Sequence, residues 1–144
     1  MGVIDDLEKL RDQLIKHEGL RLKPYRDTAN KLTIGIGRNL DDRGITEEEA
    51  LFLLNNDIGL VREQLEGRFP WFLDLDEVRQ RVLSDMCFNL GINGLVGFKK
   101  MLTAVQEKHY AQAAKHMRAS VWATQVKGRA QILAQMMETG EDRV

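Results

Sequence analysis

The sequence predicts an α+β protein that is mostly α-helical. Apolar residues recur at helical spacing in the first 18 residues and again in most of the chain after residue 46. Between these parts, residues 20–40 lose the helical period, and Leu32, Ile34 and Ile36 alternate with small or polar residues. We therefore expect one small antiparallel sheet early in the chain and helices on both sides of it.

The first helix is expected to end at Glu18. Asp5 and Asp6 suit the positive first turn of such a helix, and Gly19 suits the position just past its end. A stripe of apolar residues at helical spacing marks one face: Val3, Leu7, Leu10 and Leu14. The following strands include Pro24, and a turn is predicted over residues 28–31.

Helices resume at a capping box, in which Thr46 is followed three residues later by Glu49. We expect one helix from there to about Asn56 and a second from about Gly59 to Glu66, before the pattern breaks at Gly67 and Pro70. A further helix is predicted to begin at Asp76, with a buried face formed by Val78, Val82, Leu83, Met86 and Leu90.

The last third of the chain is predicted to be helical as well. The segment GINGLVGF, residues 91–98, reads as a glycine-punctuated turn with one short helix. Three amphipathic stretches follow, near residues 98–105, 109–119 and 126–138.

Composition bounds the class of protein. At 144 residues, 43% hydrophobic and 30% charged, the chain is expected to form a single globular domain, 1–144. The N-terminus lacks the apolar core of a signal peptide, so synthesis in the cytosol is expected. The single cysteine, Cys87, permits no internal disulfide, and the three scattered histidines have no metal-ligand spacing. Neither a metal nor a cofactor is predicted.

Charge is unevenly distributed although the net charge is −1. Residues 21–43 carry six bases and three acids, residues 44–98 four bases and ten acids, and residues 99–131 seven bases and one acid. This pattern is compatible with an anionic polymer on one face, and equally with solvated surfaces of uneven composition.

Glu18, Asp27 and Thr33 form the candidate catalytic group. Glu18 lies nearly in line with the apolar stripe and at the negative end of the first helix, so both features favour its protonated form. Asp27 lies in a polar segment and should stay ionised. Two carboxyl groups with such opposed environments are typical of glycoside hydrolysis, and the Thr33 hydroxyl is placed to hold a water against Asp27. The spacing alone is also compatible with a helix-end acid, a turn residue and a strand residue without catalytic roles.

The surrounding residues resemble the phage lysozyme (muramidase) family of the T-even type. The pattern E-G-x-R-L-x-x-Y-x-D-x5-T-I-G-I-G runs from Glu18 to Gly37. The segments CFNLGINGLVGFKKML, residues 87–102, and HYAQAAKHMRASVWATQVKGRAQ, residues 109–131, are similar to later helices of that family. The resemblance covers almost the whole chain.

This resemblance implies a lysozyme-like fold with two lobes. Residues 1–18 would pack on the helical lobe, residues 19–58 would form the sheet-containing lobe, and residues 59–144 would form a linking helix and the helical lobe. The resemblance implies cleavage of the β-1,4 bond between N-acetylmuramic acid and N-acetylglucosamine in peptidoglycan. Glu18 would be the acid, and Asp27 with Thr33 would activate water with inversion, for which carboxyl groups about 6.5–9.5 Å apart are expected.

The resemblance also implies substrate-binding residues, namely Phe88, Met101, His116, Gln125 and Leu40. Phe88 would offer an apolar face to a sugar ring, although a core position on its helix is an equal alternative. Met101 stands where the family has a polar contact and cannot hydrogen-bond strongly, whereas His116 can donate or accept. Arg38 replaces a family histidine directly after TIGIG.

The expected role is that of an endolysin for host cell lysis. Such an enzyme would be a monomer that accumulates in the host bacterial cytoplasm and needs a holin to reach the wall. Neither nucleic acid binding nor stable membrane association is expected. Two alternatives stay open: a lytic transglycosylase, which usually dispenses with the acid that directs water, and an inactive wall-binding module.

Overall fold

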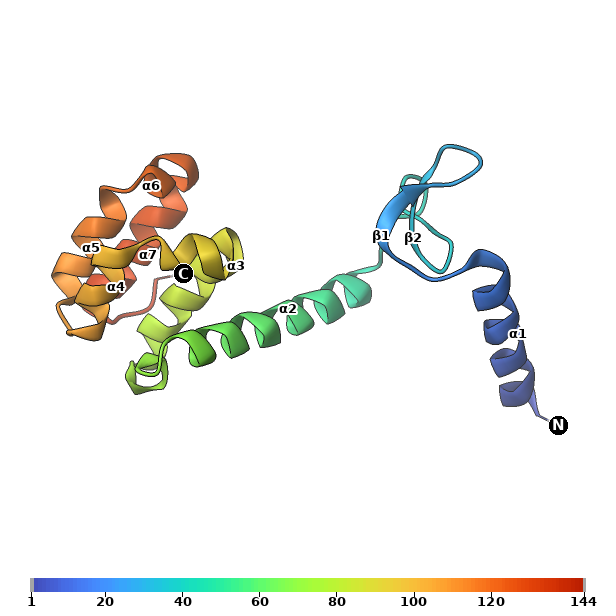
Figure 1. The fold of residues 1–144 in the computed structure, drawn as a ribbon, viewed down its shortest axis with the longest axis horizontal. Helices are drawn as coiled ribbons and strands as arrows, with labels where there is room; N and C mark the ends of the chain where they lie inside the picture. Colours follow the sequence, from blue (N-terminus) through green and yellow to red (C-terminus); the bar gives the residue numbers. More distant parts are fainter. Residues whose placement is uncertain (1, 144) are drawn as a thin grey trace. The chain divides into compact units, whose positions relative to one another are not determined.

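The computed structural model describes residues 2–143 and confirms a mostly helical α+β fold (Figure 1). The chain forms two compact units, an N-terminal unit up to Phe52 and a C-terminal unit from Leu53. The predicted lobe boundary at residues 58 and 59 and the predicted packing of residues 1–18 stay predictions.

The N-terminal unit begins with α1 (Val3–Glu18), which ends at the predicted residue. Gly19 follows with a φ of 75°, a conformation that favours glycine, and its N–H donates to the carbonyl of Ile15. This abrupt end turns the chain out of the helix directly after Glu18. Asp5 and Asp6 lie in the first turn, as predicted.

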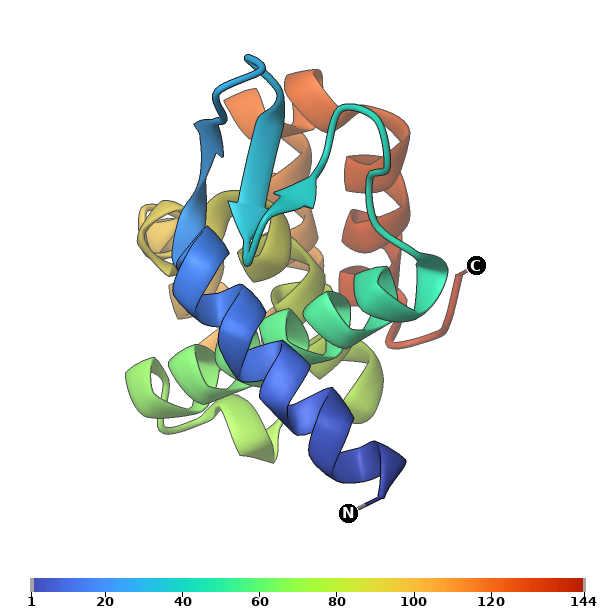
Figure 2. The ribbon, with the colours of Figure 1, turned by 90° about the vertical axis from the view of Figure 1, so that its right-hand side faces the viewer.

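A three-stranded antiparallel sheet follows α1, in the order β1 (Arg21–Arg26), β2 (Leu32–Gly35) and β3 (Arg38–Asn39). Figure 2 shows β1 and β2 side by side. Tyr25 pairs with Thr33, and Thr33 pairs with Asn39 on the other side. Pro24 lies on the edge strand β1, within the stretch between Arg21 and Tyr25 where the β1–β2 register is irregular, and proline is tolerated at such positions.

Helix α2 (Glu47–Arg68) begins with the predicted capping box. The Thr46 N–H donates to Glu49 Oε1 at 2.8 Å, and the Glu49 N–H donates to Thr46 Oγ1 at 3.1 Å. The predicted break between Asn56 and Gly59 is wrong, because α2 is continuous there. A glycine inside a helix costs only about 1 kcal/mol, whereas the nearest proline in this direction, Pro70, lies just beyond the end of α2.

The C-terminal unit contains the rest of α2, the short 3-10 helix η1 (Phe72–Asp74) and helix α3 (Glu77–Val96). Asp76 caps α3 by accepting the Arg79 N–H at 3.1 Å, as its predicted start requires. Gly91, with φ 77° and ψ 161°, interrupts α3 and leaves a short helical piece after it. The predicted glycine-punctuated turn is therefore confirmed.

The remaining helices are α4 (Lys99–Gln106), α5 (Tyr110–Arg118), α6 (Val121–Val126) and α7 (Gly128–Thr139). Helix α5 packs against α4 and α7, and α7 packs against α3. The sequence did not predict α6, since six residues are too few to display a helical period, although Ser120 accepts the Ala123 N–H and caps it.

An apolar core fills the C-terminal unit. The predicted buried face of α3 is largely confirmed, with Val82, Leu83 and Met86 at 0% exposure. The largest fully buried side chains include Leu65, Phe72, Leu83, Met86, Leu95, Met101, Met117 and Met137. Over residues 2–143, no helix combines the length and apolar character that crossing a bilayer requires.

Candidate active site

Glu18 is the last residue of α1, and its side chain lies against the turn between β2 and β3. A Cβ atom added to Gly37 would lie 2.8 Å from Glu18 Oε2, so only glycine lets the backbone approach the carboxyl group this closely. The same carboxyl borders a groove whose apolar wall includes Leu14, Ile15 and Ile36. Within the N-terminal unit Glu18 is nevertheless exposed, so this unit by itself does not supply the predicted burial.

Asp27 lies in the turn between β1 and β2, and one of its oxygens holds that turn. Oδ1 accepts the N–H of Ala29 at 2.9 Å and the N–H of Lys31 at 2.8 Å. The Asp27 N–H in turn donates to the Lys31 carbonyl at 3.0 Å. These hydrogen bonds to Oδ1 fix the orientation of the carboxylate. Within the N-terminal unit, no described residue donates a hydrogen bond to the other oxygen, Oδ2. A second oxygen is thus left for a water molecule.

Thr33 is the one buried residue described in the N-terminal unit, with 3% exposure. Its hydroxyl donates to the Lys31 carbonyl at 2.8 Å, which leaves the oxygen's lone pairs as acceptors. The backbone of Lys31 therefore contacts both Asp27 and Thr33. The structure brings these two predicted residues together through one intervening peptide, and Glu18 belongs to the same unit.

Arg38 follows Gly37 directly and clamps β3 to the start of α2. Its guanidinium donates to Glu49 Oε1 at 2.8 Å and to Oε2 at 2.6 Å, and to the Gly44 carbonyl at 3.2 Å. These hydrogen bonds from Arg38, with those from Thr46, lower the pKa of Glu49 to about 2. Arg38 thus fixes the strand that follows Gly37, the residue whose backbone lies against the Glu18 carboxyl group.

The predicted substrate-binding residues are scattered over both units. Phe88 is 47% exposed on α3, so within the C-terminal unit the alternative of a core position does not hold. Met101 is 1% exposed and belongs to the apolar core, so the structure does not bring it to the surface. Gln125 is exposed on α6. Leu40 follows β3 in the N-terminal unit, where its N–H donates to the Leu32 carbonyl at 2.7 Å.

His116 is half-buried and lines a pocket formed by α4, α5 and the segment between them. Lys99, Thr103 and His109 line the same pocket. His116 therefore has a polar surrounding in which it can donate or accept a hydrogen bond.

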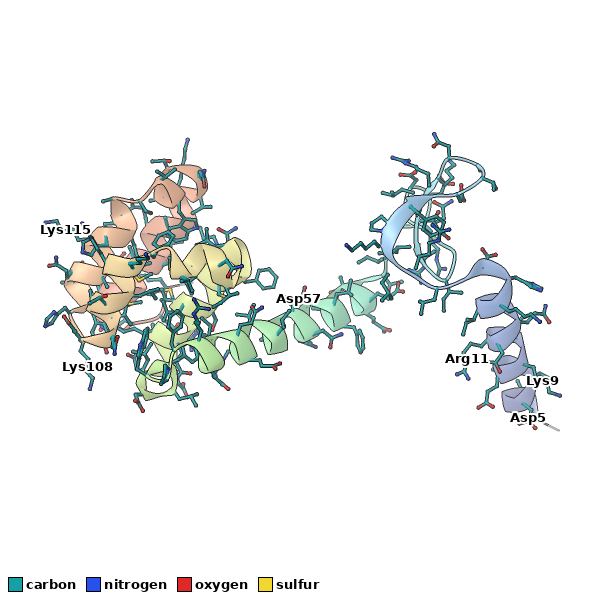
Figure 3. All side chains as sticks on the ribbon, viewed as in Figure 1. Asp5, Lys9, Arg11, Asp57, Lys108 and Lys115 are labelled. Atoms are coloured by element: carbon teal, nitrogen blue, oxygen red, sulfur yellow. The ribbon has the colours of Figure 1, made fainter. Side chains whose placement is uncertain are left out.

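The basic stretch 99–131 is partly neutralised by acids from other helices. Arg118 pairs with Glu138, and Arg129 pairs with Asp85. Lys108 and Lys115, by contrast, project outward from the C-terminal unit (Figure 3). The predicted charge asymmetry is thus weaker on the surface than in the sequence.

The side chains that support the Asp27 turn were not predicted from the sequence. Asp41 and Asp42, in the loop after β3, pair with Arg26 and Lys31 respectively. The only signal for this arrangement is the alternation of bases and acids over residues 21–43, and it does not specify partners. Gly37 was likewise missed as a contact of Glu18, although TIGIG places a glycine there.

Cys87 is buried at 1% exposure, and desolvation raises the pKa of its thiol. Among the side chains that the structure describes, no group of three or more His, Cys, Asp or Glu residues is arranged to hold a metal ion.

Comparison with known proteins gives a family match over most of the chain. Residues 15–137 match the family described as phage lysozyme. The chain is 28% identical to a probable T4-type lysozyme 1 of Dictyostelium discoideum, over 93% of the chain and 96% of that protein. It is also 30% identical to the pre-baseplate central spike protein Gp5 of Enterobacteria phage T4, over 91% of the chain but 28% of that protein.

Proposed function

Because the chain belongs to the phage lysozyme family and is therefore a peptidoglycan-hydrolysing glycosidase, we propose that it cleaves the β-1,4 bond between N-acetylmuramic acid and N-acetylglucosamine. Residues 15–137, which match the family, contain Glu18, Asp27 and Thr33. No cofactor or metal is required for this reaction.

The proposed mechanism inverts the configuration at the anomeric carbon. Glu18 gives its proton to the glycosidic oxygen as the bond between that oxygen and the anomeric carbon breaks. A water molecule attacks the opposite face of the sugar ring and gives a proton to Asp27, while Thr33 orients that water.

One observation carries these roles, namely the arrangement of Asp27 and Thr33 around Lys31. Asp27 uses Oδ1 for the turn and keeps Oδ2 for a water, and the buried Thr33 hydroxyl is fixed to the same peptide. A general base needs a fixed orientation and a free acceptor, and this turn supplies both. The close approach of the Gly37 backbone to the Glu18 carboxyl supports a fixed position for the acid.

We propose that the enzyme is an endolysin. In this role it acts as a monomer, accumulates in the host bacterial cytoplasm and reaches the wall after a holin opens the membrane. Similarity to the central spike protein of phage T4 favours a second setting, in which the enzyme is part of a phage particle. Lysis of cells that express the chain with and without a holin distinguishes the two, since an endolysin lyses only with the holin.

Two other activities predict different products from the same wall. A lytic transglycosylase leaves anhydro-muramyl ends, because the sugar's own hydroxyl closes the ring in place of water. A wall-binding module releases no sugar at all and only sediments with the wall. The presence of both Asp27 and Thr33 favours hydrolysis over either alternative.

Mass analysis of the fragments released from purified, outer-membrane-stripped walls tests the proposal. We expect fragments with reducing N-acetylmuramic acid ends, and NMR of a fresh digest should show the α-anomer first, as inversion of a β-linkage requires. Heat-inactivated protein is the control. Anhydro-muramyl ends, a β-anomer formed first, or sedimentation with the wall without release would each contradict the proposal.

A further inference from the structure

The backbone of Lys31 links the two residues proposed to activate water. Its N–H donates to Asp27 Oδ1 at 2.8 Å, and its carbonyl accepts the Asp27 N–H at 3.0 Å and the Thr33 hydroxyl at 2.8 Å. Any displacement of this peptide therefore moves Asp27 and Thr33 together. The position of residue 31 determines the geometry of the pair.

The 40–44 loop, which follows β3, contacts the Lys31 peptide and the residue after it. Asp42 Oδ1 accepts a hydrogen bond from Lys31 Nζ at 3.0 Å. Asp41 Oδ2 accepts the N–H of Leu32, the next residue, at 2.7 Å. Two adjacent carboxylates thus bind the side chain of residue 31 and the backbone of residue 32.

Asp41 also stabilises the other side of the turn. The same Oδ2 accepts Arg26 Nη1 at 3.2 Å, and that nitrogen donates to the Asn30 carbonyl at 3.3 Å. Arg26 immediately precedes Asp27 in the chain. Asp41 therefore contacts Arg26 and Leu32, the residues before and after the Asp27 turn.

The loop itself is held in place, so it can act as a support. The Asp42 N–H donates to Asn39 Oδ1 at 2.9 Å, and Asn39 Nδ2 donates to Asp42 Oδ2 at 3.1 Å. Asn39 lies on β3 directly opposite Thr33 on β2. The support therefore connects back to the strand that carries Thr33.

Both members of the Lys31–Asp42 pair are charged at neutral pH. Hydrogen bonding to Lys31 lowers the pKa of Asp42, and hydrogen bonding to Asp42 raises the pKa of Lys31. The Lys31 and Asp42 side chains are 42% and 59% exposed, so their ion pair contributes little to the free energy of unfolding. Its main effect is to orient residue 31.

We propose that Asp41 and Asp42 are positioning residues that hold Asp27 and Thr33, through the backbone of residues 31 and 32, in the geometry for water activation. The proposal rests on the proposed function. It predicts that these exposed carboxylates, which contact no reacting atom, affect turnover more than substrate binding. Small displacements of a catalytic group have large effects on rate, about a hundredfold for 1 Å.

The test measures kcat and KM on a soluble peptidoglycan oligosaccharide, which avoids effects of charge on wall adhesion. We expect Asp41→Ala to lower kcat about tenfold with KM nearly unchanged. This loss is smaller than the hundredfold loss for a 1 Å displacement, because we expect Asp27 and Thr33 to move by less than 1 Å. Asp41→Asn keeps an oxygen that can accept the Leu32 N–H, so it should recover most of this loss. Asp74→Asn is the charge-matched control, because Asp74 is exposed in η1 and forms no ion pair with any described residue.

Asp42 is tested by reversing its ion pair. We expect Asp42→Lys to lower kcat about tenfold and the double change Lys31→Asp with Asp42→Lys to restore much of it, because the attraction returns with opposite sign. Hydrogen exchange of residues 21–40 confirms that each variant stays folded. The proposal would be overturned by an unchanged kcat in Asp41→Ala, or by equal decreases in kcat in Asp41→Ala and Asp41→Asn. A rise in KM with unchanged kcat would also overturn it. If the wild type itself releases no reducing ends, the proposed function fails instead.

Discussion

The two units of this enzyme are organised by different forces. In the C-terminal unit, apolar side chains from α2 to α7 form one buried core. In the N-terminal unit, the one buried residue among those described is the polar Thr33, and the contacts that define the unit are strand pairing, turn hydrogen bonds and ion pairs. The proposed catalytic residues all lie in this second, polar environment.

This difference matters because the two kinds of contact constrain geometry to different degrees. Apolar burial is non-directional and depends mainly on the area removed from water. Hydrogen bonds depend on distance and angle, so they fix the directions of side chains such as Asp27 and Thr33. We infer that the C-terminal unit is stabilised mainly by its apolar core, and that hydrogen bonds in the N-terminal unit set the geometry of the proposed catalytic residues.

The largest effect is expected in the core of the C-terminal unit. Phe72→Ala removes a side chain at 0% exposure and should lower the free energy of unfolding by about 3–5 kcal/mol. Leu73→Ala, at 61% exposure in the same 3-10 helix, should change it by less than about 1 kcal/mol. Urea unfolding followed by tryptophan fluorescence measures both, since Trp71 and Trp122 lie in this unit. Similar decreases in the free energy of unfolding in the two variants would show that apolar burial does not determine the stability of this unit.

A smaller effect on stability, with a clear effect on rate, is expected at Thr33. Thr33→Val keeps the shape but removes the hydrogen bond to the Lys31 carbonyl, which should cost about 1 kcal/mol of stability. We expect kcat to fall at least about tenfold, because the proposed role of the hydroxyl is to orient the attacking water. Thr33→Ser keeps the hydroxyl and is the matched control. If valine and serine gave the same kcat, the hydroxyl would have no role in turnover.

The smallest effect concerns the Arg38–Glu49 clamp, and it depends on pH. The pKa of Glu49 lies below its ordinary value, at about 2, so its stabilising contribution is complete above the ordinary value and disappears as the pH falls toward 2. At pH 7, Glu49→Gln should increase hydrogen exchange in residues 38–50 roughly threefold over the wild type at the same pH, and this ratio should approach one near pH 2. Glu48→Gln is the control, as Glu48 forms no ion pair with a described residue. A ratio that did not change with pH would contradict the role of the ion pair.

The same contrast explains what the sequence could predict. Features determined by residues close in the sequence were predicted well. They include the end of α1 at Gly19, the capping box of Thr46 and Glu49, and the buried face around Val82 and Met86. These features follow from local periods and from residues that favour helix ends.

The remaining features depend on contacts that local patterns do not specify. Helix α2 continues through Gly59, where a single interior glycine costs only about 1 kcal/mol, and the short helix α6 begins at a cap formed by Ser120. The pairing of Asp41 and Asp42 with the Asp27 turn joins residues up to 15 positions apart, and any of several bases in residues 21–43 was an eligible partner. The motif could therefore locate the candidate catalytic residues, but not the residues that hold them in place.

The proposed reaction depends on the carboxyl group of Glu18 at the end of α1, and the rate at which a Glu18 variant clears cell walls tests this dependence. The initial rate of turbidity loss of outer-membrane-stripped walls is compared between the wild type and Glu18→Gln, with Glu8→Gln on the same helix as the control and circular dichroism to confirm folding. We predict that Glu18→Gln loses activity by a factor of about 10²–10⁴ while Glu8→Gln keeps the wild-type rate. A folded Glu18→Gln variant that clears walls at the wild-type rate would show that the reaction does not need this carboxyl group.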